Sequence, residues 1–237
     1  MEGMQTIGLI GGMSWHSTVE YYRLVNELVA ERRGGHASAR VALQSLDFAE
    51  IRDCQLRDDW DQAGRLLAQA AQQCELAGAD LVLICTNLMH RVADDVQAAI
   101  DIPLLHIADA LADRARAQGW SRLGVLGTSW VMEEDFYVGR LARHGLTIEV
   151  PGPDDRAEAD RVIFDELTRG IVRDESRASY ANILGRLRDQ GAEAVVLGCT
   201  EIEQLIRPED APLPVLPSMR THAEAAVAAA LGDRLLA

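Results

Sequence analysis

The sequence has no apolar run of the roughly 18 residues that a helix needs to cross a bilayer. Its first residues, MEGMQTIGLIGG, lack the basic and long apolar segments of a secretory signal. Positive charge is scarce, because 23 Lys and Arg stand against 37 Asp and Glu, for a formal net charge of −14. We therefore expect a cytoplasmic protein that binds neither nucleic acid nor a membrane, since both select clustered positive charge.

Signatures of metals and nucleotide cofactors are also missing. The four cysteines form no CxxC pair, and no two histidines have the i, i+4 spacing of a metal site, so we expect free thiols and no metal. The glycine-rich segment GLIGGMSWHST is neither GxGxxG nor a Walker loop. It is a simple strand-to-helix turn or, with its backbone N–H groups at a helix start, a turn that binds a small carboxylate.

What the sequence does contain is an alternation of short apolar and long amphipathic segments, which predicts an α/β fold. A capping box, Ser17 to Glu20, is expected to start the first helix. We expect strands at 6–12, 41–48, 81–85, 102–107 and 122–130, and helices at about 17–33, at about 59–77 and from about 92.

The second part of the chain repeats the first. RLGVLGTSW (122–130) resembles TIGLIGGMSW, GAEAVVLGCTEIE (191–203) resembles GADLVLICTNLMH (78–90), and LPVLPS (213–218) resembles IPLLHI (102–107). Three landmarks in the same order predict two pseudo-symmetric, Rossmann-like lobes, each a parallel sheet flanked by helices. We expect an N-terminal lobe of residues 1–117 plus 213–237 and a C-terminal lobe of residues 118–212.

Ligands of parallel sheets bind beyond the carboxyl ends of the strands, so the active site is expected in the cleft between the lobes. The repeat aligns Cys199 with Thr86 and places Cys85 opposite Gly198. Cys199, at a strand end in the polar context GCTE, is either a small core residue or a catalytic thiol with a lowered pKa. Thr86 is either a strand-end cap or a catalytic hydroxyl, and Cys85 is expected to point into the core.

Two further residues near these strand ends have open roles. His90, three residues after Asn87, either faces the cleft or caps a helix. Glu201 is a helix-cap carboxylate or a partner of Cys199.

Taken together, GGMSWHST, ICTNLMH, GTSWVMEEDFY and GCTEI resemble the aspartate/glutamate racemase family, which works without pyridoxal phosphate. The resemblance covers essentially the whole chain. It implies an isomerase with no cofactor, in which a thiolate removes the α-proton of an amino acid on one face and a second group returns a proton on the other. Cys199 matches the second catalytic cysteine, and Thr86 occupies the position of the first.

The resemblance also implies substrate contacts and an assembly. Expected substrate-binding residues are Met13, Ser14, Gln55, Asn87, Leu88, Thr128 and Thr200, with His90 and Glu201 supporting them. Acid-specific members carry an arginine shortly after the second strand, where this chain reads Ser45-Leu46-Asp47-Phe48. Asp47 and Phe48 suit a basic or apolar substrate side chain better than a second carboxylate. Related proteins are commonly homodimers, so a homodimer is expected.

Two alternatives to a racemase of aspartate, glutamate or a broader set of amino acids stay open at this point. One is a one-thiol decarboxylase or cis–trans isomerase of small dicarboxylic acids on the same scaffold. The other is a catalytically weak amino-acid-binding protein.

Overall fold

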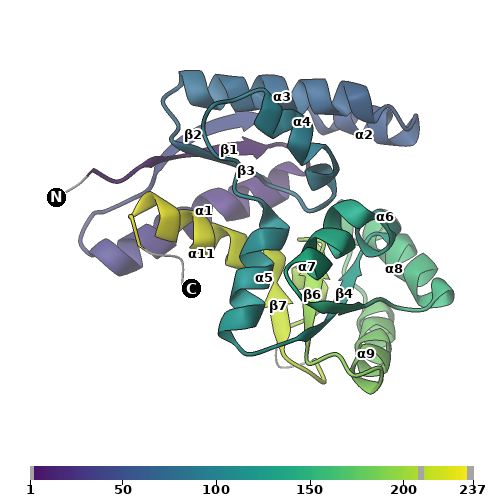
Figure 1. The fold of residues 1–237 in the computed structure, drawn as a ribbon. Helices are drawn as coiled ribbons and strands as arrows, with labels where there is room; N and C mark the ends of the chain where they lie inside the picture. The colour runs from purple at the N-terminus through teal and green to yellow at the C-terminus, as the bar shows by residue number, and fades with distance from the viewer. Residues whose placement is uncertain (1–2, 208–210, 234–237) are drawn as a thin grey trace. The chain divides into compact units, whose positions relative to one another are not determined.

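A computed structural model describes residues 3–207 and 211–233. The chain forms two compact units. Unit 1 consists of the residues up to Ala110 together with the segment from His222 onward, and unit 2 is Leu111–Thr221. Each unit has its own parallel sheet flanked by helices, so the predicted α/β fold with two repeated lobes is confirmed (Figure 1). Among the described residues, no helix is both long and apolar enough to cross a membrane.

Unit 1 is built around the sheet β2-β1-β3. Helices α1 and α3 cover its opposite faces (Figure 1). Its elements are β1 (Thr6–Gly11), α1 (Trp15–Arg33), β2 (Arg40–Ser45), α2 (Phe48–Leu56), α3 (Trp60–Leu76), β3 (Leu81–Ile84), the 3₁₀ helix η1 (Leu88–Val92), α4 (Ala93–Ala98) and the start of α5 (Ile107–Ala117).

Unit 2 is built around the sheet β5-β4-β6-β7. Its elements are β4 (Arg122–Gly127), α6 (Ser129–Glu133), the π-helix η2 (Asp135–Gly139), α7 (Arg140–Arg143), β5 (Thr147–Glu149), α8 (Pro153–Asp165), the 3₁₀ helix η3 (Leu167–Arg169), α9 (Asp174–Asp189), β6 (Ala194–Gly198), α10 (Ile202–Leu205), β7 (Val215–Pro217) and the first turn of α11 (Ser218–Ala230). The rest of α11 belongs to unit 1.

Hydrogen-bonded register supports the internal repeat. Gly8 of β1 pairs with Val82 of β3, as Gly124 of β4 pairs with Val195 of β6. Ile84 of β3 pairs with Ile10 and Leu197 of β6 pairs with Leu126, two residues further along each strand. Two residues further along, Thr86 and Cys199 therefore occupy equivalent places in the two units, as the sequence alignment predicted.

Two local predictions are wrong. The first helix begins at Trp15 with Ser14 as its N-cap residue, so Ser17 and Glu20 lie inside the helix and form no capping box. The segment 102–107 is not a full strand: it meets β3 by one parallel bridge, Val82 to Leu104. The amide of Val82 donates to Pro103 O, and the amide of Leu105 donates to Val82 O. Proline supplies no amide hydrogen, which limits how far the ladder extends.

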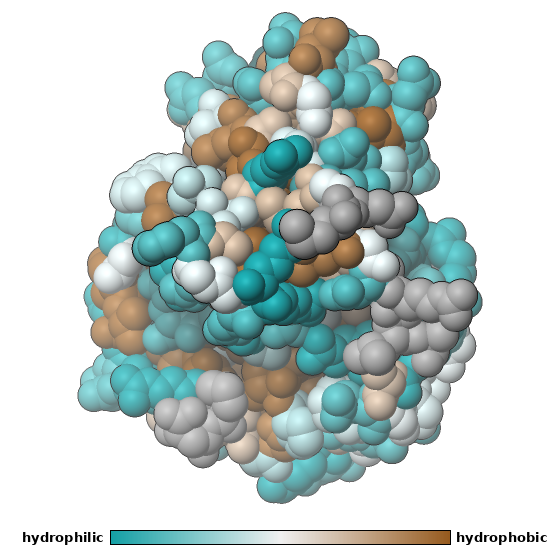
Figure 2. Space-filling view, turned by 90° about the vertical axis from the view of Figure 1, so that its left-hand side faces the viewer, coloured by the Kyte–Doolittle hydropathy of each residue, from teal (hydrophilic) through white to brown (hydrophobic). Residues whose placement is uncertain are grey.

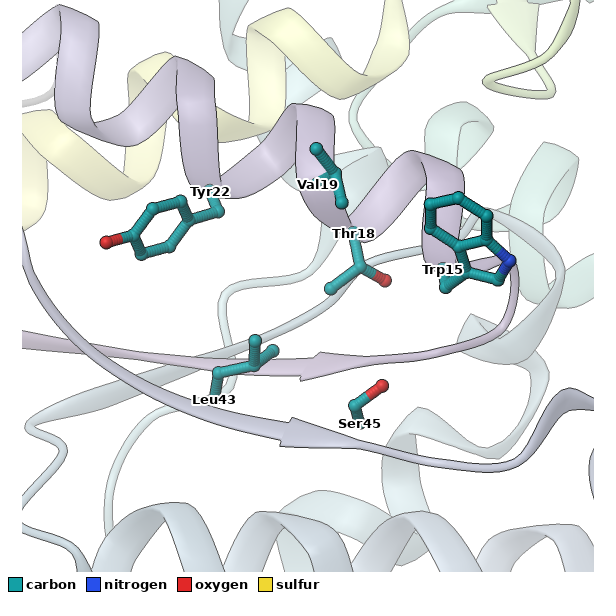
Figure 3. A pocket seen from close by; sticks show the side chains of 6 residues that line it. All are labelled: Trp15, Thr18, Val19, Tyr22, Leu43 and Ser45. Carbon is teal, nitrogen blue, oxygen red and sulfur yellow. The ribbon is translucent and has the colours of Figure 1, made fainter.

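Exposed apolar residues gather on one face of unit 1. Trp15, Val19 and Tyr22 of α1 and Leu43 of β2 are each between 42% and 60% exposed. Together with Thr18 and Ser45 they line a shallow groove of about 310 Å³, in which the rings of Trp15 and Tyr22 flank the space above Leu43 (Figure 3). The face seen in Figure 2 carries hydrophobic residues in separate patches among hydrophilic ones, which is normal for a globular protein.

Candidate functional site

The turn after β1 is shaped by a glycine that no other residue can replace without strain. Gly12 has a φ of +91°, and a Cβ atom there would lie 2.0 Å from Leu46 O. Its amide donates to Thr18 Oγ1 at 2.8 Å, and the amide of Leu46 donates to Gly11 O at 3.0 Å. The turn therefore packs directly against the end of β2. Met13 is buried and Ser14 half-buried, at the N-terminus of the 19-residue helix α1.

A second turn follows β3 and carries the predicted residues Thr86, Asn87 and Leu88. The side chain of Thr86 is half-buried, whereas Asn87 and Leu88 are buried. Cys85, one residue earlier, is 1% exposed, and burial raises the pKa of its thiol far above the ordinary value. Cys85 is thus a core thiol, as predicted, and the half-buried Thr86 is the more exposed of the two residues at this strand end.

Helix α2 reaches the same turn through Gln55. Gln55 is 7% exposed, and its Nε2 donates to the sulfur of Met89 at 3.3 Å. Arg52, one helical turn earlier, donates from Nη1 to Gln55 Oε1 at 3.1 Å. The structure therefore brings a guanidinium to the predicted substrate contact.

The structure gives a local role to Asp47, which from the sequence was expected, with Phe48, to suit a basic or apolar substrate side chain. It is the N-cap residue of α2, and its carboxylate accepts from the amide of Ala49 at 2.9 Å. The carboxylate of this segment therefore caps the N-terminus of α2. The cation that contacts Gln55 is Arg52, which sequence reasoning missed because only the i, i+3 spacing on a helix would have linked the two.

In unit 2, Cys199 follows β6 and donates from Sγ to Glu201 Oε2 at 3.1 Å. Thr200 Oγ1 donates to the same oxygen at 2.8 Å. Burial, together with the negative charge of Glu201, raises the pKa of the Cys199 thiol well above its ordinary value. The expectation that the strand end lowers this pKa is wrong, because α10 has only four residues while a carboxylate stands beside the sulfur.

A buried hydroxyl lies next to Cys199. Gly127 pairs with Gly198, so the residues that follow them, Thr128 and Cys199, end neighbouring strands at the same edge of the sheet. Thr128 is 6% exposed, and among the described residues its Oγ1 has no hydrogen-bond partner. A buried hydroxyl without a hydrogen-bond partner costs free energy of folding. Its position beside the thiol is therefore typical of a group that binds a ligand.

Of the two roles expected for His90, the structure supports helix capping, because the buried ring accepts from the amide of Ile107, the first residue of α5, while its Nδ1 lies 2.8 Å from Thr86 O. It belongs to a cluster with His106 and His222 that the sequence did not reveal. The structure thus gathers Thr86, Asn87, Gln55 and His90 in unit 1, and Thr128, Cys199, Thr200 and Glu201 in unit 2.

Comparisons with known proteins identify the family. Residues 10–226 match the family model "Asp/Glu/Hydantoin racemase". The chain belongs to this family. It is an enzyme, an isomerase of the racemase type.

Individual relatives agree. A structure from Yersinia pestis named "putative Asp/Glu racemase" is 45% identical, with a TM-score of 0.92 over 96% of this chain and 100% of that one. An aspartate racemase homologue from Pyrococcus horikoshii is 31% identical, with a TM-score of 0.84 over 96% and 100%. The broad specificity amino-acid racemase RacX of Bacillus subtilis is 20% identical over 71% of this chain and 73% of RacX.

Proposed function

We propose that this protein is a cofactor-independent amino-acid racemase in which Cys199, as thiolate, removes the α-proton and Thr86 serves the opposite face of the α-carbon. The observation that carries the proposal is the contact of the Cys199 thiol with the Glu201 carboxylate at 3.1 Å. A thiol that already donates toward a carboxylate has a place for its proton when it becomes the base. The equivalence of Thr86 and Cys199 in the strand ladders supports the pairing of the two groups.

Proton transfer alone does not make the reaction feasible. A general base contributes roughly 10²–10⁴-fold, whereas the α-proton of an amino acid is very weakly acidic. The enolate-like carboxylate that forms must therefore be stabilised by donors. We assign this role to the backbone of the Gly12-Met13-Ser14 turn, to Asn87 and to Thr200. The buried hydroxyl of Thr128, which has no hydrogen-bond partner among the described residues, supports a contact with the same ligand.

Aspartate and glutamate are the substrates that we favour. Arg52 stands within hydrogen-bonding distance of Gln55, and a guanidinium paired with a carboxylate gives a strong, directional contact. Gln55 in turn contacts Met89, close to Thr86 and Asn87. Together they offer a site for a second carboxylate, whereas a broad-specificity enzyme would not need a cation at this position.

The two faces of the substrate are served unequally. A threonine hydroxyl has a very high pKa, so Thr86 is a poor base and acts through an ordered water when it returns the proton. Because the family's second cysteine acts on the L-enantiomer, we expect turnover to be slow and conversion from L to D to be the easier direction.

The test is deuterium wash-in from D₂O. With L-aspartate and L-glutamate, Cys199→Ser should exchange the α-hydrogen far more slowly than the wild type, by a factor of roughly 10² or more. Cys85→Ala, which removes a buried thiol one residue before Thr86, is the matched control and should keep exchange. Equal exchange in Cys199→Ser and wild type would refute the role of Cys199.

The alternatives have their own readouts. A decarboxylase would release CO₂ from substituted malonates, a cis–trans isomerase would convert maleate, and a binding protein would bind amino acids without exchanging their α-hydrogen. The homodimer suggested by family resemblance is part of this proposal. Light scattering of the full chain should give twice the monomer mass of 25.9 kDa.

A further inference from the structure

Three histidine rings lie together in the interior of unit 1. His90, His106 and His222 are 2%, 3% and 0% exposed. The centroid of the His90 ring is 4.5 Å from that of His106 and 5.6 Å from that of His222. The proposed reaction uses none of these rings, so their role needs a separate explanation.

The partners of His90 fix its proton. Its Nδ1 lies 2.8 Å from the carbonyl oxygen of Thr86, which can only accept, so Nδ1 carries the proton and donates. Its Nε2 accepts from the amide of Ile107 at 3.2 Å, so this nitrogen carries none. Both ring nitrogens are therefore engaged by backbone, and the ring is neutral.

The other two rings are fixed in the same way. His106 Nδ1 accepts from the amide of Ala108 at 3.1 Å. His222 Nε2 donates to Leu105 O at 2.8 Å, and its Nδ1 is 3.0 Å from the hydroxyl of Tyr21, which donates to it. His90 and His106 thus satisfy two amides at the N-terminus of α5, which a helix leaves without internal partners.

The backbone at Thr86 explains why a side chain is needed there. In an α-helix the amide of His90 would donate to Thr86 O, four residues back. Here η1 is a 3₁₀ helix, and that amide donates to Asn87 O at 3.2 Å instead. Thr86 O is left over, and the ring of the same residue, His90, donates to it. One residue therefore holds both carbonyls of the Thr86-Asn87 turn.

We propose that His90 is a positioning residue: by holding the carbonyl of Thr86 it fixes the peptide plane after Thr86 and hence the direction of the Thr86 hydroxyl. The inference rests on the proposed function, because it concerns the face of the substrate that Thr86 serves. Cys199 lies in unit 2 and is independent of this contact. Loss of the contact should therefore impair inversion more than exchange.

The surroundings of His90 keep its ring neutral over the working pH range. The groups that face the cluster are His106 before α5, Asp109 on α5, His222 on α11 and Tyr21 on α1. Burial, and then the closeness of His106 and His222, which disfavours a positive charge on the ring, lowers the pKa of His90 well below its ordinary value. The positive end of the α5 dipole acts in the same direction.

Two variants separate the two hydrogen bonds of His90. In His90→Asn the side-chain amide nitrogen takes the place of Nδ1 and keeps the donor to Thr86 O. In His90→Gln the longer side chain reaches Ile107 and loses Thr86. Both variants remove the ring and leave a buried amide, so they are matched in size class and polarity.

The readout is the ratio of inversion to solvent exchange for the L-substrate in D₂O, measured by chiral chromatography with mass spectrometry. We expect His90→Asn to keep the wild-type ratio within about twofold. His90→Gln should lower it roughly tenfold, the effect of losing one hydrogen bond that orients a reacting group. His106→Asn, which keeps an acceptor for Ala108 and does not touch Thr86, should leave the ratio unchanged.

Each other outcome is informative. An unchanged ratio in His90→Gln, or an equal fall in both His90 variants, overturns the positioning role and leaves His90 as a helix-capping residue. If the wild type itself exchanges no α-hydrogen, the proposed function fails and the positioning role fails with it. If His90→Gln does not fold, His90→Ala, which also lacks the donor to Thr86 O, replaces it, and an unchanged ratio in that variant overturns the positioning role; if His90→Asn does not fold, His90→Gln is compared with His106→Asn.

Discussion

Glu201→Gln should lower the pKa of the Cys199 thiol. In the wild type the carboxylate accepts a hydrogen bond from the thiol at 3.1 Å and would repel a thiolate in the same place. The substitution keeps the shape of the side chain, removes the charge, and supplies an amide that can donate to a thiolate. Burial, the other cause of the raised pKa, stays.

The size of the effect follows from the distance. Two unit charges 3.1 Å apart repel by about 1 kcal/mol in bulk water and by about 5 kcal/mol at an effective dielectric constant of about 20. Removing this repulsion should therefore lower the pKa of the thiol and move the pH dependence of its ionisation clearly to lower pH. Cys199 is only partly buried, which favours the lower of the two energies.

The assay is the rate of iodoacetamide alkylation at Cys199 as a function of pH, followed by peptide mass spectrometry. The other three cysteines are buried and serve as internal references. Glu203→Gln makes the same change in net charge two residues further on and should move the midpoint by much less. An identical midpoint in Glu201→Gln and wild type would refute the electrostatic argument, as would a wild-type midpoint well below pH 8.

Three further predictions follow. Arg52→Gln should lower kcat/KM for aspartate and glutamate roughly tenfold to hundredfold while sparing methionine, because it removes a charged hydrogen-bond donor; an equal loss for all substrates in the racemase assay would contradict the assignment. Burial lowers the pKa of His222 from 6.5 to about 4, so the unfolded chain binds more protons between these values. The free energy of unfolding should therefore fall by on the order of 3 kcal/mol as the pH drops through this window. Urea unfolding at pH 7 and 4.5 measures this difference, which should be smaller in His222→Gln. Gly12→Ala should destabilise the protein by about 2 kcal/mol more than Gly78→Ala. Both positions have positive φ, but only at Gly12 would the added Cβ atom meet backbone atoms, those of Leu46. Equal shifts of the thermal unfolding temperature would show that the turn accommodates the Cβ atom.

The sequence was sufficient for the features that repeat. Apolar segments of strand length and the echo between residues 78–90 and 191–203 predicted two parallel sheets, and the ladders place Thr86 and Cys199 equivalently. The ends of helices and strands were harder to predict from the sequence, because they depend on single contacts. Ser14 rather than Ser17 precedes α1, since the chain turns at Gly12 against Leu46.

Contacts between distant segments escaped sequence reasoning for a physical reason. The histidine cluster is formed by three segments that lie far apart in the chain, those of His90, His106 and His222. Their positions in the sequence do not indicate that the three rings meet. The tautomer of His90 depends on Thr86 O, which is left for the ring because η1 winds as a 3₁₀ helix. The pKa of Cys199 likewise depends on a side-chain rotamer, that of Glu201, and not on the pattern GCTE alone.

The repeat also explains why the two faces of the substrate should differ. If Thr86 is equivalent to Cys199, then Leu88 is equivalent to Glu201, two residues further in each unit. The thiol thus has a carboxylate within 3.1 Å, while the position that would offer one to Thr86 carries an apolar side chain that is 9% exposed. A hydroxyl without a neighbouring acceptor at this position can pass on a proton from water but is poorly placed to lose its own. The bias toward L-to-D conversion that we expect therefore has two causes in the chain, threonine in place of cysteine and leucine in place of glutamate, and replacing Thr86 by cysteine alone should not make the two directions equal.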